Sequence, residues 1–181
     1  SLEDIWLSGT AQQLQSDIDN KKFTYCAVKH CGVVNHNIDF LSYQIGVNID
    51  ESCNLACPSC RRQLINHTSG PVFEKRKALV NHLVSLISKF DKPLELTMCG
   101  NGDPLASLIM RPLVTNLKPR DNQTIKLHTN GLLMRKLLPD TAILNHISNF
   151  HISIDAGSAD VYQQVRYPGN FKVLLDNLAW L

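Results

Sequence analysis

Along residues 43–181 the spacing of apolar positions changes repeatedly between two residues and three or four. A two-residue spacing indicates a strand, and a spacing of three or four indicates one face of a helix. The strand-like segments are residues 43–50, 94–98, 124–128 and 150–155. The helix-like segments between and after them are residues 73–90, 105–116, 132–147, 158–165 and 171–181. The pattern therefore predicts strand–helix units repeated four times.

Two prolines and one polar residue affect the expected helix bounds. Pro112 predicts a kink in the second of these helices, and Pro139 leaves either one helix or two in the third. Nearer the start of the chain, Thr10 is the expected N-cap of a short helix. We therefore expect a short, mostly helical N-terminal extension over residues 1–41 and one α/β domain over residues 42–181.

Each predicted strand ends in an unusual polar or glycine-rich segment. The first is followed by Cys53–Cys60, the second by Gly100–Pro104 and the third by Thr129–Gly131, and the fourth contains Ser153 and Asp155 near its end. Alternating strands and helices imply a parallel sheet, in which functional groups gather at the carboxyl ends of the strands. These four segments are therefore expected to meet at one edge of the sheet.

Composition limits the classes of protein that this chain can represent. The 181 residues are 44% hydrophobic and 19% charged, which suits a globular domain with a real core. A net charge of +2 without a dense basic block gives no argument for nucleic acid. No apolar run approaches the roughly 18 residues of a membrane span, and no signal peptide is recognisable, so we expect a cytoplasmic protein. The chain starts without Met and ends inside a helical pattern, so we also expect a longer parent polypeptide.

Cysteine usage indicates thiols or metal ligands rather than disulfides. The six cysteines are at positions 26, 31, 53, 57, 60 and 99, in a chain that has no secretion signal. Cys53, Cys57 and Cys60 form a C-x3-C-x2-C run. An iron–sulfur cube needs four ligands, so three thiolates would leave one iron open, as is typical of a reactive site. The alternative is a structural zinc site completed by His67 or another cysteine.

Taken together, these segments resemble the signatures of one family. Cys53–Cys60 resembles the cysteine motif of the radical S-adenosylmethionine (radical SAM) superfamily, and Gly100–Pro104 is similar to its "GGEP" turn. The other similar segments are Thr129–Gly131, which matches "TNG", and Ile152–Asp155 with Tyr162, Arg166 and Gly169–Phe171, which match a region common in SPASM-type members. The motifs occur in family order. The resemblance implies a partial (β/α)6 TIM-like barrel, truncated here to about four units.

The resemblance also implies a cofactor set and a chemistry. Cys53, Cys57 and Cys60 would bind a [4Fe-4S] cluster whose fourth iron holds S-adenosylmethionine (SAM). Reductive cleavage of SAM would then give a 5′-deoxyadenosyl radical that abstracts hydrogen from a substrate. The implied cofactor-binding residues are Ser59, Gly100, Asn101, Gly102, Asp103, Thr129, Asn130, Ser153, Asp155 and Arg166. Among these, the glycines would let the backbone approach the ligand, and Arg166 would meet the methionyl carboxylate.

Departures from the family pattern keep two alternatives open. Ser59 stands where an aromatic residue usually flanks the adenine, and Asn101 stands where a second glycine is usual. Neither change removes an iron ligand. The first alternative is the zinc-binding structural or interaction module, and the second is a degenerate relative that binds a cluster without turnover.

The implied partners are an electron donor of the flavodoxin or ferredoxin kind and a substrate, for which a peptide is favoured over a small metabolite or a lipid- or sugar-linked molecule. Cys26 and Cys31 lie in a stretch that resembles the tail of a SPASM domain, where cysteines hold auxiliary clusters. Here we expect free thiols, with an auxiliary cluster as the alternative. Cys99 is expected to be a small buried residue, and His128 and His151 core or edge histidines.

Overall fold

The computed structural model describes residues 2–25, 27 and 43–181, and its contacts separate residues 1–40 from residues 41–181. The first unit contains the short helices α1 (Leu2–Trp6) and α2 (Gly9–Asp19). The N-cap of α2 is Ser8, whose Oγ accepts a hydrogen bond from Ala11 N at 3.2 Å, so the expected cap at Thr10 is wrong. Thr10 already lies inside the helix. Cys26 and Cys31 fall outside the described residues, as does the prediction made for them.

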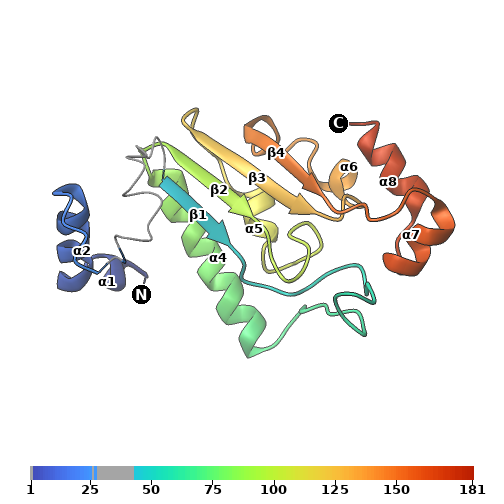
Figure 1. Ribbon diagram of the computed structural model, residues 1–181, viewed down its shortest axis with the longest axis horizontal. Helices are drawn as coiled ribbons and strands as arrows, with labels where there is room; N and C mark the ends of the chain where they lie inside the picture. The colour runs from blue at the N-terminus through green and yellow to red at the C-terminus, as the bar shows by residue number, and fades with distance from the viewer. Residues whose placement is uncertain (1, 26, 28–42) are drawn as a thin grey trace. The chain divides into compact units, whose positions relative to one another are not determined.

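The second unit is built on a parallel sheet of four strands in the order β1-β2-β3-β4 (Figure 1). The strands are β1 (Tyr43–Val47), β2 (Leu94–Met98), β3 (Gln123–Thr129) and β4 (Ile147–Ile152). The connections contain α4 (Pro71–Lys89), α5 (Arg111–Thr115), α6 (Met134–Leu137) and the 3₁₀ helix η2 (Leu144–His146). Helices α7 (Ala159–Val165) and α8 (Phe171–Leu178) follow the last strand. The α/β prediction with a parallel sheet is confirmed, whereas a TIM-like barrel is not shown.

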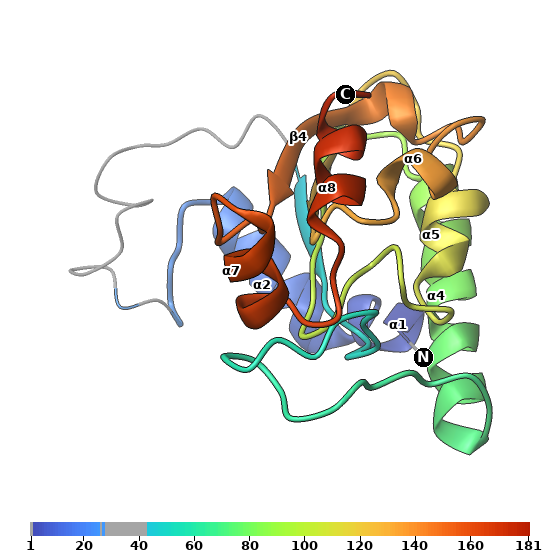
Figure 2. The same ribbon diagram turned by 90° about the vertical axis from the view of Figure 1, so that its right-hand side faces the viewer.

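The core lies on one face of the sheet, under α4, α5 and α6 (Figure 2). Leu94, Leu96 and Met98 of β2 are almost completely buried, and Ile125 and Leu127 of β3 join them. Successive side chains of a strand point to opposite faces, so the residues between these face the other way. Those residues are polar and half-buried or exposed. The second face of the sheet is therefore a polar surface.

Two predicted helices are much shorter in the structure. Residues 105–116 contain only α5, and Pro112 occupies its first turn, where a missing N–H costs nothing, so the expected kink is wrong. Residues 132–147 contain only α6 and η2. The fourth strand begins at Ile147 instead of residue 150, because Ile147 pairs with Ile125 on β3. No helix in the described part of the chain is long and apolar enough to span a bilayer.

Candidate functional site

A cavity of about 380 Å³ lies at the carboxyl ends of the strands. Eleven of the thirteen predicted site residues line it, namely Cys53, Cys57, Cys60, Gly100, Asn101, Gly102, Asp103, Thr129, Asn130, Ser153 and Arg166. The other two, Ser59 and Asp155, are exposed and do not line it. The four segments that follow the strands therefore meet at one edge of the sheet, as their positions in the sequence predicted.

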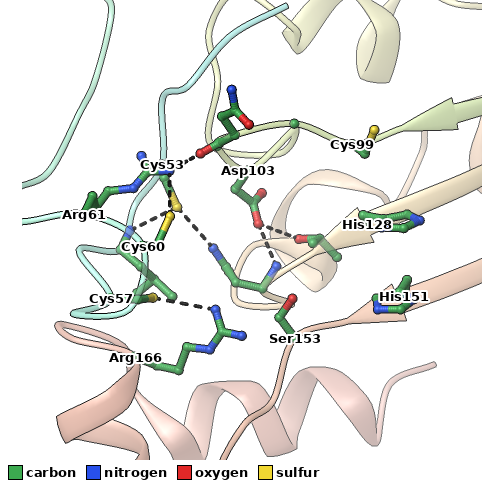
Figure 3. Close-up of a pocket in the computed structure, with 16 residues that line it drawn as sticks. Cys53, Cys57, Cys60, Arg61, Cys99, Asp103, His128, His151, Ser153 and Arg166 are labelled. Atoms are coloured by element: carbon green, nitrogen blue, oxygen red, sulfur yellow. Dashed lines mark hydrogen bonds between the residues drawn. The ribbon is translucent and has the colours of Figure 1, made fainter. Parts of the chain in front are cut away.

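Three thiols form one end of this cavity (Figure 3). Cys57 is buried, Cys53 is half-buried and Cys60 is exposed, and none of them is in a disulfide. The N–H groups of Cys60 and Arg61 both donate to Cys57 O at 2.9 Å, forming a tight turn. Cys53 N donates to Ile65 O at 2.9 Å and closes the loop that carries all three cysteines.

A single zinc ion and an iron–sulfur cluster need differently spaced ligands. Within residues 2–25, 27 and 43–181, no three His, Cys, Asp or Glu side chains lie close enough to hold one metal ion. Zinc holds each sulfur at about 2.3 Å, which requires a tight group. A cube accepts each thiolate on a different iron and so spreads its ligands. The zinc alternative lacks its suggested fourth ligand, His67, among the residues that line the cavity.

The cysteine loop is held against the glycine turn after β2 by close backbone contact. A Cβ atom on Gly102 would lie 2.2 Å from Ser52 O and 2.6 Å from Glu51 C. At this contact Asp103 N donates to Ser52 O at 2.9 Å. Gly102 was expected to let the backbone approach a ligand, and in the structure it lets the backbone approach the cysteine loop. The turn therefore helps to place the thiols.

Asp103 joins the glycine turn to the end of β3. Its carboxylate is buried, and Oδ1 accepts from Leu105 N at 2.9 Å and Ala106 N at 3.3 Å. Oδ2 accepts from Thr129 Oγ1 at 2.9 Å and Asn130 N at 2.7 Å. Four donors satisfy both oxygens from within the chain. Asp103 therefore acts on the cavity by positioning the strand ends around it.

Asn130 connects the end of β3 with the cysteine loop. Its Nδ2 donates to Asn54 Oδ1 at 2.8 Å and lies 3.8 Å from Cys53 Sγ. Its Oδ1 accepts from Leu132 N at 3.1 Å. Burial raises the pKa of the Cys53 thiol, and the nearby charge of Asp103 adds to this effect. A metal centre that binds Cys53 must therefore displace a proton, as metals do when they bind thiols.

The buried carboxylate of Asp50 also helps to hold the cysteine loop in place. Asp50 accepts from Ser107 Oγ at 2.5 Å, and its Oδ1 lies 2.8 Å from His67 Nδ1 and 3.6 Å from Arg76. Burial alone would raise the pKa of Asp50, but hydrogen bonds from His67, Ser107 and Ser52 outweigh it and hold that pKa below its ordinary value. This network ties the start of the cysteine loop to the segment before α5. Sequence reasoning missed it.

Two guanidinium groups reach the thiols. Arg166 forms an ion pair with Asp155, and its Nη1 lies 3.6 Å from Cys57 Sγ. Arg61, which sequence reasoning missed, has Nη2 at 3.5 Å from Cys60 Sγ. Its position directly after the third cysteine was the available signal. Both arginines line the cavity.

His128 and His151 lie at the opposite end of the cavity from the thiols (Figure 3). They are register partners on β3 and β4, and their rings stack with centroids 4.5 Å apart. Cys99, at the end of β2, also lines this end and is half-buried. The two histidines are exposed rather than in the core. Aligning the predicted strands by the motifs that follow them would have placed these residues side by side.

Comparison with known proteins gives a distant structural match. No protein-family model matches the chain, and no curated protein matches its sequence. Among solved structures, it is similar to Streptococcus suis SuiB bound to the precursor peptide SuiA, with a TM-score of 0.47 and 12% identity. The match covers 93% of this chain and 42% of SuiB, so the chain spans less than half of that protein. A likeness this distant establishes neither the fold nor the activity of the chain.

Proposed function

We propose that residues 42–181 form a radical SAM domain, in which Cys53, Cys57 and Cys60 hold a [4Fe-4S] cluster that binds SAM. The observation that carries the proposal is the convergence of four motif-bearing strand ends on one cavity with three free thiols at one end. The motifs resemble those of the family, and they are far apart in the sequence. Because a parallel sheet brings the turns after neighbouring strands to one edge in any case, the support comes from the family-like residues in those turns and from the three free thiols among them.

The residues present fit such a cluster. Among the described residues, the three thiols at that end of the cavity are ligands of the kind that iron–sulfur clusters prefer. Cys99 is the one further described cysteine that lines the cavity, and it lies at the histidine end. Three thiolates without a fourth leave one iron open for an external ligand.

When bound, the cluster would supply the electron that cleaves SAM and releases the 5′-deoxyadenosyl radical, and the chain supplies position. The glycine turn and Asn130 would hold the methionyl part of SAM, and Ser153 would contact its ribose. Arg166 retains N–H groups for the methionyl carboxylate. Hydrogen would be abstracted from a substrate, favoured as a peptide by the family resemblance, with a flavodoxin- or ferredoxin-like protein as electron donor.

The test is anaerobic reconstitution of the full chain with iron and sulfide, followed by quantification of both. Wild type and Cys99→Ala should each hold one cluster, whereas Cys57→Ala should lose it. Dithionite and SAM should then yield 5′-deoxyadenosine from wild type. Zinc without iron in the purified protein would establish the structural metal site instead. A stable cluster that never cleaves SAM would identify a degenerate relative.

A further inference from the structure

Arg61 joins the two loops that form the thiol end of the cavity. Its Nη1 donates to Glu51 O at 2.6 Å, at the start of the cysteine loop. Its Nη2 donates to Asn101 O in the glycine turn and lies 3.5 Å from Cys60 Sγ. The planar guanidinium has five N–H donors in a fixed arrangement, so it can hold both carbonyls and a sulfur at once.

The charge of Arg61 is not offset by a carboxylate. In the described part of the chain its partners are two neutral carbonyl oxygens and a thiol, and it is half-buried. Arg166 differs, because Asp155 pairs with it. The positive charge of Arg61 therefore acts on Cys60 without a carboxylate paired to it, and partial burial weakens the screening by solvent.

This charge matters because reduction changes the net charge of a cluster. The potential of an iron–sulfur cluster depends on its net charge, on hydrogen bonds to its sulfurs and on solvent exposure. A cation beside a thiolate ligand stabilises the reduced form, which carries one more negative charge, over the oxidised form. An N–H donor to the same sulfur acts in the same direction.

We propose that Arg61 is a positioning residue that raises the reduction potential of the cluster, and this inference rests on the proposed function. It would make the one-electron reduction that precedes SAM cleavage accessible to a biological donor. Its backbone contacts keep the charge at a constant distance from Cys60. Arg62, the next residue, is exposed and does not line the cavity, so it provides a matched control.

The experiment is a potentiometric titration of the reconstituted 181-residue chain with dithionite, followed by electron paramagnetic resonance. The variants are Arg61→Gln, Arg61→Met, Arg61→Lys and the control Arg62→Gln, each with its iron and sulfide content measured. At the wild-type midpoint potential, the ratio of oxidised to reduced cluster should rise at least tenfold in the two neutral Arg61 variants, or about 59 mV for a one-electron couple. Arg61→Lys should retain most of the wild-type potential, and Arg62→Gln all of it.

Each result decides the question. Equal potentials in all loaded variants would overturn the electrostatic role. If neither neutral variant holds a cluster but Arg61→Lys does, the result supports the role of the positive charge. If Arg61→Lys also fails to hold a cluster, Arg61 only holds the two loops together and the electrostatic role is overturned. A wild-type protein that holds no cluster contradicts the proposed function itself, before the variants are compared.

Discussion

Replacing Gly102 by alanine tests whether the glycine turn positions the cysteine loop. The added Cβ would lie 2.2 Å from Ser52 O and 2.8 Å from Ser52 C, and both are backbone atoms. Side chains cannot rotate away to relieve this clash, so the two loops must separate. Separation would also break the hydrogen bond from Asp103 N to Ser52 O and draw Arg61 away from one of its carbonyls.

The cost can be worked out from these contacts. Overpacking costs about 1–3 kcal/mol, and a lost hydrogen bond adds about 1 kcal/mol. We therefore expect Gly102→Ala to lower the free energy of unfolding by about 3 kcal/mol, a decrease in Tm of about 6–12 °C for a domain of this size. The control is Gly46→Ala on β1, where an added Cβ meets nothing within 4 Å and should cost under about 1 kcal/mol.

The assay is urea denaturation followed by circular dichroism, together with the iron content of reconstituted protein. Gly102→Ala should lose stability and cluster together, because the displaced loop carries Cys53, Cys57 and Cys60. Gly46→Ala should keep both. If Gly102→Ala matched the control in stability and iron content, the close contact between the loops would not be what positions the thiols.

Further predictions concern three charged or titratable sites. Asp50→Asn should cost about 2 kcal/mol near neutral pH. The pKa of Asp50 is lowered on folding, so its contribution to folding stability is complete above its ordinary pKa of 3.8 and is lost as the pH falls through the pKa of the folded state. The free energy of unfolding of the variant should therefore fall less steeply with decreasing pH than that of wild type. Equal pH dependence of the two proteins would contradict this. Burial, and secondly the charge of His151, lower the pKa of His128 below 6.5, so the fold loses stability as the pH falls through 6.5. In His151→Asn this pKa, measured by NMR, should rise part of the way to 6.5; no change would refute the coupling. Lys172→Ala removes an exposed pair with Asp176 and should change stability by under about 0.5 kcal/mol in thermal melts, a larger loss showing that the pair is more than a surface contact.

Local spacing determined much of the fold. The second strand has the bounds that its alternating pattern predicted, Leu94–Met98. Successive side chains of a strand point to opposite faces of the sheet, so the apolar–polar alternation can be read from neighbouring residues alone. The same reasoning failed for residues 105–116, where Leu105, Ile109 and Leu113 are buried at helix-like intervals although only Arg111–Thr115 is helical. Buried apolar residues recur at these intervals in either conformation, so spacing alone could not distinguish them.

The candidate site also has parts that the sequence predicted and parts that only the structure showed. The three cysteines, the glycine turn and the Thr129–Gly131 segment are short continuous motifs, and parallel topology brings motifs that follow neighbouring strands to one edge. Only the tertiary structure placed Arg61 against Asn101, 40 residues away, and Ser107 against Asp50, 57 residues away. Such contacts form when loops close over a sheet, and no residue in the sequence specifies its partner across that distance. The sequence by itself therefore brought most of the motif residues to the cavity, and the packing of the loops decided which charged groups surround the thiols.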